Sequence, residues 1–308
     1  MTMTWAKYYR GDGDRRPQKL PPSPPWRTFP RRSLHLEFQP PPGLVEAVNA
    51  ALLLRRPLLV SGPAGSGKST VVDQVAHELD LGPVLRWHIT SRSTLRDALY
   101  RYDALGRVHA QNLRAAGGGH GDDKITDYLR LGPLGTALLP SDRPRALLID
   151  EIDKSDLDLP SDLLDVLERG EFEIPELARH AEAEVQVRHW DSAVTSPVVS
   201  GRVACTEFPF IVLTSNDERD FPPAFLRRCI RFEMPRPTAD DLRRIVAAHL
   251  GTSSDEVTEL VETFAARLER GDVLAVDQLL NIIHLVTGPV GADRARLEPL
   301  LLRQLTHG

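Results

Sequence analysis

The chain has 308 residues, of which 41% are hydrophobic, and a formal net charge of -5 at pH 7. This length suits one large domain with a smaller one, or two of ordinary size, and the composition is typical of a soluble globular protein. No apolar run approaches the roughly 18 residues of a membrane span, so we expect a cytoplasmic protein with no membrane partner. The negative charge excludes a general attraction to nucleic acid. Cys205 and Cys229 lack CxxC spacing, which argues against a zinc site or a disulfide framework.

Residues 1–43 form a leader that is rich in proline and arginine. Proline pairs and triplets exclude helices and sheet interiors, so we expect this segment to be extended or disordered by itself. Its aromatic residues leave two interpretations open, a solvated tail or a segment that docks on a neighbouring surface; they are Tyr8, Tyr9, Trp26 and Phe29.

Residues 44–235 alternate between helical and strand patterns. Helical spacing at 44–52 is followed by a short apolar strand at 58–60, a helix at 71–79 and a strand at 84–89. Ser93 or Thr94 is placed to cap the next helix. The glycines between 106 and 123 predict a surface loop.

The second half of this segment continues the alternation. We predict a strand at 146–149, a helix at 159–167 that ends at Gly170, and a strand at 208–214. This order predicts an α/β fold with a mostly parallel sheet flanked by helices. Residues 236–308 show only helical patterns, at 242–250, 257–268, 276–286 and 297–305, so we expect a small all-helical domain after Pro235.

The loop after the first strand matches GxxxxGK[ST], and it consists of Gly62, Pro63, Ala64, Gly65, Ser66, Gly67, Lys68, Ser69 and Thr70. Glycines allow successive backbone N–H groups to surround phosphate oxygens at a helix N-terminus. Lys68 is then expected to reach the β- and γ-phosphates, and the Ser69 hydroxyl to bind Mg²⁺. The flanking strand and helix make this P-loop, or Walker A motif, the strongest signal in the chain, and it predicts binding of ATP.

Two acidic residues, Asp150 and Glu151, end the apolar strand at 146–149. Acids at the carboxyl end of a buried strand lie where ligands of parallel sheets bind. Asp150 is expected to hold Mg²⁺ through water, and Glu151 to polarise the attacking water. This Walker B pair predicts hydrolysis of ATP to ADP and phosphate rather than binding alone.

Asn216 ends the next strand, and an arginine pair, Arg227 and Arg228, follows a short helix near Pro222. The Asn216 amide can hydrogen-bond both water and γ-phosphate without adding negative charge. A guanidinium group from a neighbouring subunit can raise the hydrolysis rate by roughly 10³ to 10⁵ as an arginine finger. Arg228 is the first candidate for this role and Arg227 the second.

In this order, the motifs at 62–70, 147–153, 213–216 and 222–229 resemble those of an AAA+ ATPase. Gly132, Pro133 and Leu134 before the acidic strand resemble the end of the insert that the MoxR-like, dynein-related branch carries in its second helix. Residues 171–207 match the position of the extra hairpin that this branch carries. The resemblance implies a ring, usually a hexamer, in which Arg228 of one subunit serves the site of its neighbour.

The same resemblance implies a chaperone-like role beside proteins with a von Willebrand factor A domain, and some similar ATPases belong to bacterial conflict systems. One position departs from the family pattern. Many relatives have an arginine at the start of a lid helix, whereas residues 272–278 contain Asp277 and no arginine. Either Arg267 or Arg270 substitutes for it, or the lid senses nucleotide differently.

Three functions remain open from the sequence. The first is a motor that remodels or activates a protein partner. The second is an ATP-gated assembly switch with slow hydrolysis, against which the intact Glu151 argues. The third is a nucleic-acid-dependent ATPase of the restriction or helicase-loader type, for which the basic leader is the only support.

Overall fold

The computed structural model describes residues 8–9, 11–12, 14–15, 17, 19–28, 38–115, 124–250, 254–272 and 274–287. The chain divides into two compact units. The core unit comprises residues 40–61 and 69–233, and the lid unit comprises residues 1–39, 62–68 and 234–308. The glycine-rich loop thus groups with the lid unit, and the lid helices begin after Met234.

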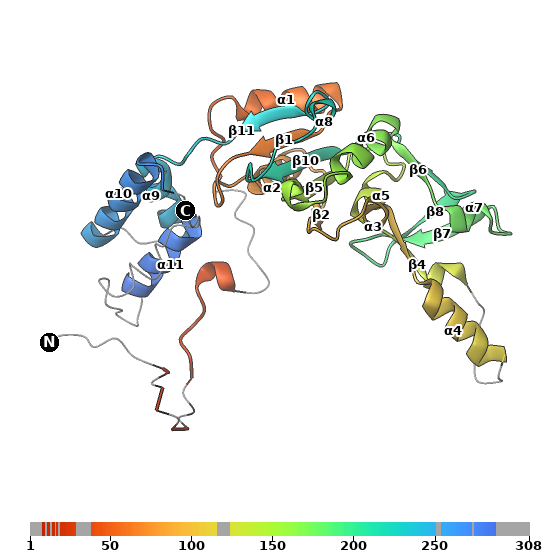
Figure 1. Cartoon of the computed structure of the whole chain (residues 1–308), viewed down its shortest axis with the longest axis horizontal. Helices are drawn as coiled ribbons and strands as arrows, with labels where there is room; N and C mark the ends of the chain where they lie inside the picture. Colours follow the sequence, from red (N-terminus) through yellow and green to blue (C-terminus); the bar gives the residue numbers. More distant parts are fainter. Residues whose placement is uncertain are drawn as a thin grey trace. The chain divides into compact units, whose positions relative to one another are not determined.

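A five-stranded sheet lies at the centre of the core unit (Figure 1). Its strand order is β11-β1-β10-β5-β2, and every neighbouring pair is parallel. Of the five strands, the inner three are apolar and largely buried because helices cover parallel sheets, whereas the two edge strands carry exposed charged or polar residues at alternate positions. The five strands are β1 (Leu58–Ser61), β2 (Leu85–His88), β5 (Ala146–Asp150), β10 (Phe210–Ser215) and β11 (Ile230–Glu233).

Helices flank this sheet, which confirms the predicted α/β fold. Thr94 caps α3 by accepting a hydrogen bond from Asp97 N at 3.2 Å, and α6 ends at Gly170 with φ 66°. The helices are α1 (Leu44–Leu54), α2 (Thr70–Glu78), α3 (Leu95–Leu99), α5 (Pro133–Ala137), α6 (Leu159–Arg169) and α8 (Pro223–Leu226), with the short η4 (Ile152–Lys154) after β5.

The loop predicted between 106 and 123 is wrong over its first part, where the structure has helix α4 (Ala104–Ala115). The Asp103 carboxylate accepts a hydrogen bond from Gly106 N at 2.8 Å, as a helix N-cap does. The prediction of a loop relied on the glycines after 116 and did not take account of Asp103 as a helix N-cap. Residues 116–123 lie outside the described part of the chain.

Residues 171–207 form more than the single hairpin expected from the family resemblance. The β7 and β8 strands pair antiparallel, and they belong to a second sheet with the order β3-β4-β7-β8-β9-β6. The strands are β3 (Tyr100–Tyr102), β4 (Leu129–Leu131), β6 (Glu171–Glu173), β7 (Glu184–Arg188), β8 (Thr195–Val199) and β9 (Arg202–Ala204); η3 (Ile125–Asp127) and α7 (Pro175–Ala178) lie between them in sequence.

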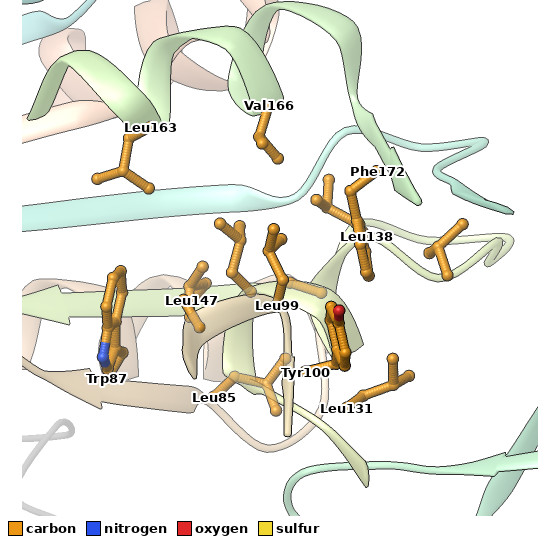
Figure 2. Packing of buried hydrophobic residues seen from close by; sticks show 14 of the residues in the cluster. Leu85, Trp87, Leu99, Tyr100, Leu131, Leu138, Leu147, Leu163, Val166 and Phe172 are labelled. Atoms are coloured by element: carbon orange, nitrogen blue, oxygen red, sulfur yellow. The ribbon is translucent and has the colours of Figure 1, made fainter. Parts of the chain in front are cut away.

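One hydrophobic cluster joins the two sheets of the core unit. Figure 2 shows Leu147 of β5 and Leu163 of α6 in the same packed layer as Tyr100 and Phe172 of the second sheet. Burial of apolar side chains is the main stabilising contribution in such a layer. The second sheet is therefore an integral part of this unit.

The lid unit contains three described helices around a separate apolar cluster. They are α9 (Ala239–Leu250), α10 (Asp255–Glu269) and α11 (Val276–Thr287), as the helical patterns predicted. The helix predicted at 297–305 lies outside the described residues. Among the helices of the described segments, none combines the length and the hydropathy needed to cross a bilayer.

Among its described residues, the leader contacts the lid helices through the 3₁₀ turn η1 (Pro25–Arg27) and through Gln39, which accepts a hydrogen bond from Arg244 of α9. The Trp26 ring packs edge-on against His249 of α9 and His284 of α11, with centroid distances of 6.3 and 5.5 Å. Tyr9 remains 88% exposed. At Trp26 the leader is therefore docked rather than fully solvated. Phe29 lies outside the described residues.

Candidate functional site

The loop between β1 and α2 turns at three glycines with positive φ, Gly62 at 132°, Gly65 at 78° and Gly67 at 85°. A Cβ on Gly62 would lie 2.9 Å from Met234 O, and one on Gly65 would lie 2.9 Å from Val276 N. Only glycine adopts this backbone readily and fits these close approaches. The spacing of glycines in the motif is therefore required by the shape of the loop.

Lys68 folds back over the same loop. Its Nζ donates hydrogen bonds to Gly62 O at 2.7 Å and to Pro63 O at 2.8 Å, and the residue is only 8% exposed. The Ser66 hydroxyl also donates to Pro63 O, at 2.8 Å. A buried ammonium group is thus held in the curve of the loop by backbone carbonyls.

Polar side chains of the core unit meet at the carboxyl ends of β5 and β10. The hydroxyl of Ser69 donates to Asp150 Oδ1 at 2.9 Å, and the hydroxyl of Thr214 donates to the same oxygen at 2.6 Å. Hydroxyl and carboxylate oxygens are ligands that Mg²⁺ accepts, so Ser69 and Asp150 suit this ion. Thr214 was given no role from the sequence. Its position near the end of β10, the strand that pairs with β5, is the signal that could have identified it.

Glu151 follows β5 directly and has a left-handed backbone, with φ 61° and ψ 49°. Its N–H donates to the Thr214 hydroxyl at 2.9 Å. The carboxylate accepts a hydrogen bond from Lys154 Nζ at 2.8 Å, and His88 Nε2 lies 3.5 Å from the same Oε2. The hydrogen bond to Glu151 raises the pKa of Lys154, so this partner keeps its positive charge.

Asn216 lies just beyond the end of β10, and Asp153 fixes its backbone. Asp153 is 5% exposed, and its Oδ2 accepts hydrogen bonds from Asn216 N at 2.8 Å and Glu218 N at 3.3 Å. The Asn216 amide donates to Glu218 Oε1 at 3.5 Å. Asp153 was given no role from the sequence, although it follows the acid pair within one helical turn.

The two arginines after α8 differ in their contacts. Arg228 Nε donates to Glu168 Oε1 of α6 at 2.5 Å, whereas the Arg227 side chain is exposed and has no ion pair or hydrogen bond with the residues that the structure describes. The next residue, Cys229, is buried, and burial raises the pKa of its thiol to about 12. The buried cysteine therefore anchors the segment as a neutral side chain.

Comparison with protein families identifies residues 57–229 as an AAA domain of the dynein-related subfamily. This match covers more than half of the chain and includes the glycine-rich loop, the acid pair, Asn216 and the arginine pair, but neither the leader nor the lid helices. The chain belongs to this family.

Solved structures also resemble this AAA protein at low identity. NtrX from Brucella abortus in complex with ATP is 15% identical over 82% of this chain and 51% of that one, with a TM-score of 0.45. Domain III of the replication initiation protein DnaA from Thermotoga maritima is 14% identical over 87% of this chain and 94% of that one, with a TM-score of 0.42. The chain thus spans about half the length of NtrX. No curated protein matches it.

Two arginines of the lid unit of this AAA protein are candidates to replace the missing lid arginine. Arg267 Nε is paired with Asp272 Oδ2 at 2.7 Å, and Arg270 follows the end of α10. Asp277 lies in the first turn of α11, next to Val276, the residue that approaches Gly65. The residue of α11 that approaches Gly65 is therefore apolar, and Arg267 already has an acidic partner.

Proposed function

We propose that this AAA protein binds ATP with Mg²⁺ and hydrolyses it to ADP and phosphate. The observation that carries the proposal is the shared oxygen Asp150 Oδ1, which accepts hydrogen bonds from Ser69 and Thr214. Ser69 directly follows Lys68 in the sequence, so the residue that donates to Asp150 adjoins the phosphate-binding loop. ATP-bound and ADP-bound structures of NtrX are among the similar proteins.

Each part of the proposed site has one task. Backbone N–H groups of residues 62–68 and the Lys68 ammonium bind phosphate oxygens, and Ser69 with Asp150 holds the ion. Bound Mg²⁺ would neutralise the negative charge of the phosphates. Phosphoryl transfer depends mainly on positioning and on charge stabilisation, and these residues provide both.

Glu151 is the proposed acceptor of the proton from the attacking water. Its left-handed backbone is held by the hydrogen bond from its N–H to Thr214, directly after the end of β5. Asn216 is the proposed partner for the same water and for the γ-phosphate through its amide. Lys154 and His88, which contact the Glu151 carboxylate, are then in a position to hold it before substrate arrives.

We further propose that the protein works as a homo-oligomeric ring, in which an arginine from one subunit completes the site of the next. The exposed Arg227 side chain, with no partner in the described residues, favours it over Arg228, which already pairs with Glu168. This reverses the preference drawn from the sequence. A hexamer, a MoxR-like chaperone role, a partner with a von Willebrand factor A domain and a place in a conflict system rest on the resemblance alone.

Two other functions keep the same ATP site. An assembly switch would hydrolyse ATP slowly, and a nucleic-acid-dependent ATPase would be stimulated by DNA or RNA in a salt-sensitive way. Steady-state rates with and without nucleic acid at two salt concentrations separate them.

Lys68→Ala tests the proposed site. We expect ATP binding to weaken by roughly 10- to 100-fold, because a hydrogen bond to a charged group contributes about 1.5–3 kcal/mol, and turnover to vanish. Calorimetric titration and phosphate release measure the two effects, with the exposed Lys124→Ala as the control. Normal affinity and turnover in the Lys68 variant would refute the assignment.

A further inference from the structure

Three arginines lie side by side on the exposed face of the second sheet. Arg101 of β3 is directly opposite Arg130 of β4, and Arg130 is in register with Arg188 of β7. All three side chains are exposed. Because neighbouring strands are about 4.8 Å apart, this arginine row extends over roughly 10 Å.

Like charges directly opposite each other destabilise a sheet. Within the described residues, the row has a single carboxylate partner, Asp97, which lies 3.8 Å from Arg101 Nε. Arg130 donates to the backbone oxygens of His189 and Trp190, and Arg188 Nε donates to Ser192 O at 3.3 Å. Two arginines of the row, Arg130 and Arg188, therefore have no ion-paired carboxylate among the described residues.

The side chains of the row are held in place although they are exposed. The guanidinium carbons of Arg101 and Arg130 lie 5.2 and 4.9 Å from the centre of the Trp190 ring. Such cation–π contacts stabilise guanidinium groups over an aromatic ring. The backbone of Trp190 is held as well, since its main-chain N–H donates to the Thr136 hydroxyl at 3.0 Å. The row is thus ordered before any ligand binds.

An open pocket of about 540 Å³ lies along the row. All three arginines line it, together with the hydrogen-bonding side chains of Gln186, Thr195 and Tyr128. Asp103 and Asp127 also line the pocket, so its three arginines exceed its carboxylates by one. The volume lies in the range of small-ligand sites, and the lining favours an anion.

We propose that this pocket binds a ligand with consecutive phosphate groups. Guanidinium groups bind phosphate through two parallel hydrogen bonds, and a row of roughly 10 Å is longer than one phosphate occupies. A free polyphosphate-type ligand and a nucleic-acid strand share this chemistry. The site belongs to the second sheet, and the inference does not depend on ATP hydrolysis at the P-loop.

The test uses the full chain with Lys68→Ala, which is expected to weaken phosphate binding at the loop. Tripolyphosphate and a labelled single-stranded oligothymidylate of about 12 nucleotides without terminal phosphates are the two probes. We expect Arg130→Gln/Arg188→Gln to weaken binding by on the order of 100-fold, since each charge-assisted bond contributes strongly. Arg202→Gln is the matched control, because Arg202 lies on the same sheet but is paired with Glu171.

The outcomes separate the two sources of phosphate. Binding of tripolyphosphate alone supports a small ligand, and binding of both probes supports a nucleic-acid strand. In either case the double variant must lose this binding. Equal binding by parent and double variant, no binding of either probe, or equally tight binding of a polyglutamate peptide would overturn the proposal. Circular dichroism verifies folding, and Arg188→Gln alone replaces the double variant if that variant unfolds.

Discussion

The hydroxyl of Thr214 connects the two acidic residues of the proposed site. It donates to Asp150 Oδ1 at 2.6 Å and accepts from Glu151 N at 2.9 Å, and the residue is only 1% exposed. Buried polar groups are costly unless each finds a partner. A single side chain of β10 therefore fixes both the carboxylate that suits the ion and the backbone turn that positions Glu151.

Thr214→Val keeps the shape of this side chain and removes both hydrogen bonds. We expect the free energy of unfolding to fall by about 1–3 kcal/mol, because Glu151 N and Asp150 Oδ1 lose a partner, and ATP turnover to fall with it. Urea denaturation and phosphate release measure the two quantities. The exposed Thr258→Val is the control, and a Thr214 variant as stable and active as the parent would contradict this role.

The contacts of Arg227 and Arg228 predict different results on substitution. Arg227→Ala is expected to lower turnover by roughly 10³-fold or more with little change in ATP affinity, as loss of an arginine finger does. Arg228→Ala removes an exposed ion pair with Glu168, which contributes roughly 0.2–1 kcal/mol. Turnover and ATP affinity of both variants provide the comparison; a larger loss of turnover in the Arg228 variant would restore the sequence-based preference.

At the scale of elements, the sequence predicted the strands and helices that carry local signals. Apolar runs gave β1, β5 and β10, and the residues that follow them placed Asp150, Glu151 and Asn216 at neighbouring strand ends. The roles of Thr214 and Asp153 were missed because they depend on contacts between residues distant in sequence. The second sheet was underestimated for the same reason, since β4 and β7 pair across a long separation.

The leader turn η1 is an element whose effect can be measured separately. Trp26 packs against the apolar cluster of the lid unit and contacts His249 and His284. We expect Trp26→Ala to reduce the free energy of unfolding by about 1–3 kcal/mol, because a partly buried aromatic ring is lost. Urea denaturation checks this, with Leu20→Ala, which is 68% exposed, as the control. Equal stability of both variants would instead support the interpretation of the leader as a solvated tail.

At the scale of the whole molecule, the AAA family assignment and the strand-end geometry support the same account. The family match covers residues 57–229, and the shared oxygen of Asp150 lies within that span. What the sequence left open, the partner and the oligomeric state, depends on surfaces rather than on the proposed ATP site. The arginine row is one such surface, and it was not visible in the sequence because strand register brings its residues together.

The central claim is that Glu151 drives hydrolysis at a site where ATP binds independently of it. The most direct test measures ATP affinity and steady-state phosphate release for Glu151→Gln beside the parent protein. We predict unchanged affinity and turnover lower by roughly 10² to 10⁴-fold, as expected when a general base is removed. Unchanged turnover in this variant, or a parent protein that binds ATP without hydrolysing it, would contradict the account.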